Sequence, residues 1–226
     1  MRRIPVYLLK QMQSVLTGHV QEEMAIPSYL HPNPVMRWMA WRRVELLADH
    51  LRRMYSCKKN PAWTQSSILD FGCGSGVMLG EASQCAERVY GSDVFIDAAL
   101  MLVNEWDLEN VTIIPSQDLI TTLSQESLDV IIAGEVLEHI NDIRQTLLFF
   151  RTRLKLTGRL LVSLPTEGML YRFGRRLAGF HGHYHLADAK LIHNQILSSG
   201  FKLESLNKTP GPGAFAIYWI VEYSLG

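Results

Sequence analysis

The sequence lacks several features that mark common classes of protein. No apolar run approaches the length of about 18 residues that crosses a bilayer, so no transmembrane helix is expected. The three cysteines form no CxxC pair and leave one unpaired, which is typical of a reducing cytoplasm rather than of a disulfide framework. No long apolar core follows Arg2 and Arg3, so the first residues do not resemble a secretory signal.

An excess of either charge is also missing, because 22 basic side chains balance 22 acidic ones. The distribution is nevertheless uneven. Residues 1–60 carry ten Lys and Arg against four Asp and Glu, residues 61–140 carry one against thirteen, and residues 141–226 carry eleven against five. Since nonspecific nucleic-acid binders are usually basic overall, nucleic acid is not expected as a partner.

The spacing of apolar residues predicts N-terminal helices followed by an α/β sheet. Val6–Leu16 and a longer segment after the proline-rich residues 27–34 both show helical periodicity. Short apolar runs then alternate with helical stretches, as buried parallel strands do; the runs are Ile68–Phe71, Arg88–Ser92, Val111–Ile114, Leu128–Ala133 and Arg159–Leu164. The last two candidate strands, residues 200–206 and 215–223, are joined by too short a link for a parallel crossover. They are therefore expected to pair antiparallel, as a C-terminal hairpin.

A glycine-rich loop follows the first of these strands, with the sequence Asp70-Phe71-Gly72-Cys73-Gly74-Ser75-Gly76. Glycines allow a sharp turn and a close approach of the backbone to a ligand. A dinucleotide-binding loop would need glycine where Val77 or Leu79 stands, and a P-loop would need a lysine that is absent nearby. The remaining pattern, Asp-x-Gly-x-Gly-x-Gly, places an acid where it would repel a pyrophosphate but attract an ammonium group. The simplest alternative is a glycine-rich turn with a capping aspartate.

The loop resembles motif I of the class I S-adenosylmethionine (SAM)-dependent methyltransferases, and the resemblance extends over roughly residues 65–206. It implies a Rossmann-like, mostly parallel, seven-stranded α/β sheet with helices on both faces. It also implies that Gly72, Gly74 and Gly76 line the methionine part of SAM and that Asp70 holds its ammonium group.

Acidic residues after later strands extend this resemblance. Asp93 ends the second strand 23 residues after Asp70, close to the spacing of about 20 residues typical of a ribose-binding acid. In the family, an acid at that place accepts hydrogen bonds from the ribose hydroxyls. Leu128–Ile140 resembles the fourth-strand motif of the subgroup that includes ubiquinone and menaquinone biosynthesis enzymes. The implied cofactor-binding residues are Asp70, Gly72, Cys73, Gly74, Gly76, Asp93, Val94, Gln117, Asp118, Leu119 and Glu135, with Asp118, or else Gln117, on the adenine amino group.

Glu135, Glu138 and His139 are spaced so that they would share one face of a helix. Two carboxylates and an imidazole suit a hard cation such as Mg²⁺, which would orient an acceptor hydroxyl and lower its pKa. The competing interpretation is that the acids favour a helix N-terminus while His139 packs under the loop. Many relatives with this motif need no metal, so the prediction is that none binds.

Histidines are the candidates for a general base, because imidazole titrates near neutral pH. His183 matches best the family's histidine just before its last helix, and His185 and His139 are the alternatives. Asp188 is the expected N-cap of that helix, which should end at residues 198–200. The competing interpretation is a cluster of surface histidines without a role.

The two basic segments are expected to select the acceptor. The predicted organisation is a helical substrate cap in residues 1–60 and a SAM-binding domain in residues 61–226, with a substrate-side insertion at residues 166–187. In that insertion Arg172, Arg175 and Arg176 share a helical face, which could bind an anionic group, contact an anionic membrane or remain solvated.

The predicted function is methyl transfer from SAM to a small or amphiphilic, lipid-like acceptor, at oxygen. Its predicted location is the cytoplasm, with peripheral membrane contact as a further expectation. An RNA 2′-O-methyltransferase and a non-catalytic SAM-binding regulatory or scaffold subunit are the alternatives. The sequence predicts no oligomeric state.

Overall fold

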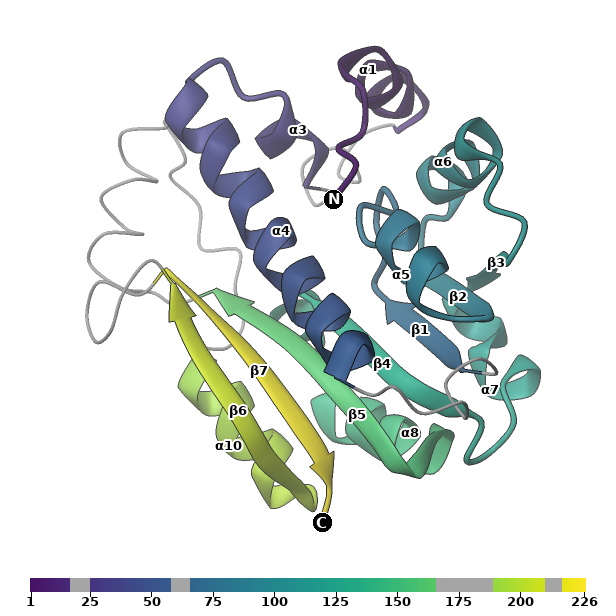
Figure 1. The fold of residues 1–226 in the computed structure, drawn as a ribbon, viewed down its shortest axis with the longest axis vertical. Helices are drawn as coiled ribbons and strands as arrows, with labels where there is room; N and C mark the ends of the chain where they lie inside the picture. Colours follow the sequence, from purple (N-terminus) through teal and green to yellow (C-terminus); the bar gives the residue numbers. More distant parts are fainter. Residues whose placement is uncertain (17–24, 58–65, 166–188, 210–216) are drawn as a thin grey trace. The chain divides into compact units, whose positions relative to one another are not determined.

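The protein is an α/β protein built around a seven-stranded sheet with the strand order β3-β2-β1-β4-β5-β7-β6 (Figure 1). The computed structural model describes residues 1–16, 25–57, 66–165, 189–209 and 217–226. Register pairs β1 with β2, β2 with β3, and β4 with β5 in parallel, whereas β7 is antiparallel to both β5 and β6. The predicted mostly parallel sheet with a C-terminal antiparallel hairpin is thus confirmed. The strands are β1 (Ser67–Phe71), β2 (Arg88–Asp93), β3 (Val111–Pro115), β4 (Leu128–Gly134), β5 (Leu154–Pro165), β6 (Phe201–Thr209) and β7 (Tyr218–Leu225).

The predicted strands are all present, with bounds that differ by one residue in β1 to β4 and by more in β5, β6 and β7. β5 begins at Leu154 instead of Arg159, because Leu154 already pairs with Leu128 before a register shift in β4. β7 ends at Leu225, and the predicted residues 215 and 216 lie outside the described ones. The chain falls into two compact units, Met1–Thr122 and Leu123–Gly226.

The first unit contains the N-terminal helices α1 (Val6–Val15), α3 (Ile26–Tyr29) and α4 (Pro34–Cys57). The apolar stripe predicted for α4 is buried, since Trp41, Val44, Ala48 and Leu51 are at most 5% exposed. Within this unit α4 contacts α5 (Leu79–Cys85), and α1 contacts α6 (Asp97–Trp106). Whether residues 1–60 act as a substrate cap stays a prediction.

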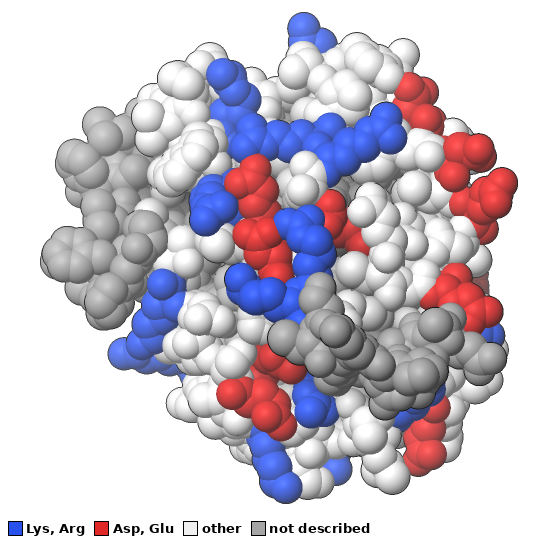
Figure 2. Space-filling model, viewed as in Figure 1, with Lys and Arg blue, Asp and Glu red and all other residues white. Residues whose placement is uncertain are grey.

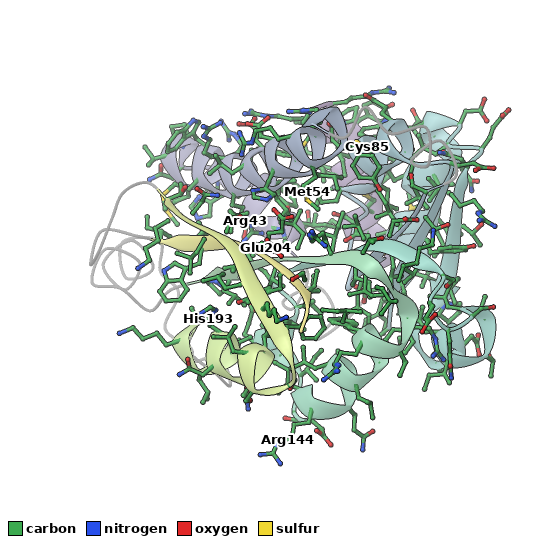
Figure 3. All side chains as sticks on the ribbon, turned by 60° about the horizontal axis from the view of Figure 1, so that its bottom comes forward. Arg43, Met54, Cys85, Arg144, His193 and Glu204 are labelled. Carbon is green, nitrogen blue, oxygen red and sulfur yellow. The ribbon has the colours of Figure 1, made fainter. Side chains whose placement is uncertain are left out.

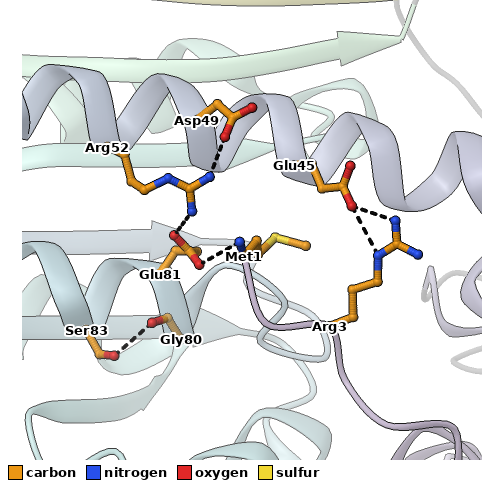
Figure 4. A network of polar contacts seen from close by, with 8 residues as sticks. All are labelled: Met1, Arg3, Glu45, Asp49, Arg52, Gly80, Glu81 and Ser83. Carbon is orange, nitrogen blue, oxygen red and sulfur yellow. Dashed lines mark hydrogen bonds and ion pairs between the residues drawn. The ribbon is translucent and has the colours of Figure 1, made fainter.

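A polar network fastens α4 to α5 (Figure 4). Glu81 of α5 is only 4% exposed and accepts a hydrogen bond from Arg52, which also pairs with Asp49. The Met1 ammonium lies 3.4 Å from the second Glu81 oxygen. Because a buried carboxylate is costly unless it is paired, these two cations allow Glu81 to lie between the helices.

The uneven charge is visible on the surface of this unit (Figure 2). Blue Lys and Arg side chains cross the N-terminal helices. Red carboxylates gather over α6 and the turn after it, where the exposed acids are Asp97, Glu105, Asp107 and Glu109.

The second unit contains α8 (Ile143–Arg153) and α10 (Ala189–Ser198) beside β4 to β7. The predicted end of α10 is confirmed: Gly200 has φ 86°, and Arg151 of α8 donates to the Ser199 carbonyl at 2.5 Å. His193 lies on α10 (Figure 3), and its Nδ1 is 2.7 Å from the Tyr223 hydroxyl on β7. β7 lies between β5 and β6. None of the helices in the described part of the chain is long and apolar enough to span a membrane.

Candidate functional site

The strand register of the first unit brings three loops to one edge of the sheet. Phe71 at the end of β1 pairs with Ser92, and Asp93 at the end of β2 pairs with Pro115 at the end of β3. Parallel strands of equal register end together, so the glycine loop, the turn after Asp93 and the segment after Pro115 share this carboxyl edge. Ligands of open α/β sheets bind at that edge.

The glycine loop has the backbone conformation that its sequence predicts. Gly72, Gly74 and Gly76 have φ values of 72°, 53° and 79°, in the left-handed region that glycine adopts without penalty. The amides of Gly72 and Cys73 both donate to the Ser92 carbonyl, at 2.8 and 2.9 Å. The loop is thereby fixed to the end of β2. α5 begins at Leu79, three residues after the last loop glycine.

Asp93 is the second point at which the loop is held. Its Oδ2 accepts the Gly74 amide at 2.8 Å, and its Oδ1 accepts the Phe95 amide at 3.2 Å. A carboxylate offers about four acceptor positions. Each oxygen of Asp93 therefore keeps a lone pair for a ligand hydroxyl.

Asp70 lies beneath the loop and is only 3% exposed. Its Oδ2 is fully buried and has no hydrogen-bond partner among the residues that the structure describes. Burial, followed by the charge of Asp93, raises the pKa of Asp70 to about 7. A buried carboxylate oxygen without a donor is the group that a ligand ammonium would satisfy.

Cys73 cannot act as a reactive thiolate in this setting. Burial raises the pKa of its thiol well above the ordinary value, and the charges of Asp70 and Asp93 raise it further. The described loop therefore holds acceptors for a cation and for hydroxyls, together with a neutral thiol. That set suits binding and orienting a ligand.

Gly74 and Gly76 differ in what surrounds them. A methyl group added at Gly74 would meet no atom of the described segments within 4 Å, whereas one added at Gly76 would lie 2.9 Å from both Leu102 Cδ2 and Leu79 Cδ1. Gly74 therefore borders open space and Gly76 borders the core. This open space and the unpartnered oxygen of Asp70 belong to the loop where the sequence predicts a ligand with an ammonium group.

We expect Gly74→Ala and Gly76→Ala to separate ligand binding from folding. Gly74→Ala should weaken SAM binding about tenfold or more, because its methyl group enters the ligand space, yet lower the free energy of unfolding by only about 1 kcal/mol. Gly76→Ala should lower that free energy by about 3 kcal/mol, because two buried leucines must move. Calorimetric titration and thermal denaturation measure the two effects. Equal loss of stability in both variants would contradict the proposed ligand space.

The residues predicted around the adenine lie at the same edge. Gln117 and Asp118 are exposed in a short helical turn, η2 (Ser116–Asp118), and Leu119 after them is buried. Val94, next to Asp93, is 68% exposed. The first unit thus carries every predicted cofactor-binding residue except Glu135, which belongs to the second unit.

The helical face predicted for Glu135, Glu138 and His139 is wrong. Glu135 has φ 53° and precedes η3 (Leu137–His139), which is a single 3₁₀ turn. Glu138 is 1% exposed, whereas His139 is exposed. One turn is too short to stack residues 135, 138 and 139 on one face. The described residues contain no group of three or more His, Cys, Asp or Glu that could hold a metal ion, so the Mg²⁺ alternative has no support.

Several predicted residues lie outside the described ones. They are His183, His185, Asp188 and the arginines 172, 175 and 176 of the insertion. Sequence reasoning had missed the Ser92 carbonyl and the Phe95 amide, since backbone groups leave no sequence signal. It had also missed Gly91, where an added methyl group would lie 2.8 Å from Ile113 Cδ1. The sequence signal for this close packing was the pair of small residues, Gly91 and Ser92, just before Asp93.

Comparison with known proteins gives a consistent result. The profile of a methyltransferase domain family matches residues 38–206. The magnesium protoporphyrin IX methyltransferase ChlM from Synechocystis PCC 6803 superposes with a TM-score of 0.65 at 17% identity, over 86% of this chain and 88% of that one. The N-methyltransferase NodS from Bradyrhizobium japonicum WM9, in complex with S-adenosyl-L-homocysteine, has a TM-score of 0.63 at 16% identity, over 96% and 98%. No curated protein sequence matches this chain.

Proposed function

Because the chain belongs to the methyltransferase domain family and is a SAM-dependent methyltransferase, we propose that SAM binds at the carboxyl edge of β1, β2 and β3. The loop of Gly72, Gly74 and Gly76 would line the methionine part. Asp70 would hold its ammonium group and Asp93 would bind the ribose hydroxyls. Asp118, or else Gln117, would accept a hydrogen bond from the adenine amino group.

The observation that carries this assignment is the buried, unpartnered Oδ2 of Asp70. A carboxylate in that position is costly until a cation reaches it. The open space beside Gly74 is where such a cation would enter. An amino-acid ammonium supplies both the charge and three hydrogen-bond donors.

Bound SAM supplies a methyl group already activated on a sulfonium. The residues of this chain then bind the cofactor, orient it and exclude water, and most of the rate gain comes from proximity and alignment. We propose a small or amphiphilic, lipid-like acceptor that is methylated at oxygen. The names of similar structures include both a magnesium protoporphyrin IX methyltransferase and an N-methyltransferase, so nitrogen is the second atom to test. His183, His185 and His139 stay the candidates for the base.

We expect methyl-labelled SAM, incubated with the protein and fractionated cell extract, to label the lipid or small-metabolite pool. Mass spectrometry of the labelled product identifies the acceptor atom. Chelator should leave the rate unchanged, since the described residues offer no metal site. Label in RNA would support the 2′-O-methyltransferase alternative, and an N-methyl product would overturn the oxygen assignment.

The resemblance to ubiquinone and menaquinone biosynthesis enzymes stays a proposal for the subgroup. We also propose a cytoplasmic location with peripheral membrane contact through the basic segments. Its support is that Cys73 and Cys85 are free thiols and that the N-terminal segment carries more Lys and Arg than Asp and Glu (Figure 2).

A further inference from the structure

The surroundings of Asp70 disfavour the ionised form of its carboxyl group. It is 3% exposed on β1, and its Oδ2 accepts no hydrogen bond. Its strand neighbour in the register is Gly91, which has no side chain to offer a donor. In the described part of the chain, this buried carboxyl group therefore has no cationic side chain that stabilises its charge.

Two titratable groups act at this place among the described residues. Asp93, at the end of β2, is a second acid whose two oxygens are fixed by the Gly74 and Phe95 amides. Because it is held there, Asp93 cannot turn away to relieve the repulsion. The Cys73 thiol is the other group, and its raised pKa keeps it neutral. Burial and Asp93 both favour a proton on Asp70, and its pKa of about 7 makes that proton exchangeable near neutral pH.

We propose that the ammonium group of SAM takes the place of a proton on Asp70: the carboxyl group is protonated in the ligand-free site and releases its proton to solvent when the ammonium group enters. This inference rests on the proposed function. The step is balanced, because the O–H bond of Asp70 breaks, a water or buffer base takes the proton, and the carboxylate pairs with the ammonium. Asp70 would then act as a specificity residue, since only a ligand with a cationic amino group replaces the proton.

The consequence is a linkage between cofactor affinity and pH. Below pH 7, binding must remove a proton, so affinity falls as pH falls; above pH 7 the site is already ionised and affinity levels off. A ligand with the same nucleoside and thioether but no amino-acid part should bind independently of pH. Methylthioadenosine is such a ligand, and it reports any other pH effect on the adenosine and ribose positions.

The test is calorimetric titration of the protein with S-adenosylhomocysteine, which keeps the ammonium group and does not react. Titrations in two buffers of different ionisation enthalpy count the protons released. At pH 7 we expect about half a proton per ligand, and the Kd should weaken about tenfold between pH 8 and pH 6. Methylthioadenosine should release no proton and keep one Kd across this range.

Asp70→Asn provides the second variant, because asparagine imitates the protonated acid in size and neutrality. It should bind S-adenosylhomocysteine weakly, with neither proton release nor pH dependence, while still binding methylthioadenosine. Tight binding of S-adenosylhomocysteine by the unaltered protein without proton release would overturn this inference and leave the proposed function intact. Absence of binding at every pH would overturn the proposed function itself.

Discussion

Asp93→Ala is expected to weaken SAM binding by about a hundredfold or more. The substitution removes the acceptor of the Gly74 amide, at 2.8 Å, and of the Phe95 amide, at 3.2 Å. It also removes the proposed partner of both ribose hydroxyls. Hydrogen bonds to a charged group contribute about 1.5–3 kcal/mol each, so losing them together exceeds the 2.7 kcal/mol or so that a hundredfold change requires. Calorimetric titration with S-adenosylhomocysteine measures the change.

Asp97→Ala is the matched control for this variant. Asp97 is an exposed acid in the first turn of α6, four residues after Asp93. Replacing it with alanine removes the same charge from the same segment. We expect its affinity for the ligand to stay within about twofold of the unaltered protein, since surface charges act weakly. Equal losses in the two variants would mean that general charge, and not the geometry at Asp93, sets the affinity.

Most of the sheet could be predicted because its signal is local. Buried strands such as Leu128–Gly134 are nearly continuous apolar runs, and the link between β6 and β7 leaves no room for a parallel crossover. The glycine loop could also be predicted, since three alternate glycines directly after a strand are typical of a ligand-binding turn. All three have the positive φ that such a turn requires. These features depend on residues close together in the chain.

The cluster of Glu135, Glu138 and His139 shows where such reasoning fails. The spacing predicts one helical face only if a helix spans all three residues, and the backbone at Glu135 is left-handed instead. The Glu135 amide donates to the Ser163 carbonyl of β5, at 3.1 Å. Contact with a strand nearly 30 residues away decides the local conformation, and no window of sequence around Glu135 contains that information.

The state of Asp70 was equally beyond the sequence. Its place near the end of β1, just before the loop glycines, predicted an acid that attracts an ammonium group, as an ionised carboxylate would. The structure adds that Asp93 is fixed beside it and that its Oδ2 has no donor. Burial and a neighbouring charge are properties of the folded chain, and together they raise the pKa of Asp70 to about 7 in the ligand-free protein.

Asp70→Asn is expected to raise the stability of the ligand-free protein, relative to the unaltered protein, more at pH 8 than at pH 5. The same substitution should abolish tight SAM binding. The ordinary pKa of 3.8 rises to about 7 on folding, so the folded chain binds this proton more tightly than the unfolded chain does. The contribution of Asp70 to the free energy of unfolding therefore falls as pH rises from about 4 to about 7, and above pH 7 the cost is complete. A rise of about three pKa units corresponds to about 4 kcal/mol, of which we expect about half to be measurable after relaxation of the site.

Thermal denaturation of both proteins at the two pH values measures this effect, and comparison within each protein cancels the packing change caused by the amide. Because the unfolded chain already loses its proton near pH 4, about two of these three pKa units act between pH 5 and pH 8, which corresponds to about 2.7 kcal/mol. With half of that measurable, the unaltered chain should lose stability relative to the variant by roughly 3–5 °C in Tm for a domain of this size. Excess SAM at pH 8 should raise the Tm of the unaltered protein but not that of the variant.

A variant with the same pH profile as the unaltered protein would show that Asp70 is ionised throughout. The buried carboxylate would then need a partner other than the cofactor. If the profiles differ as expected, the residue that binds the cofactor is also one that weakens the empty fold, and SAM stabilises the protein by removing that cost.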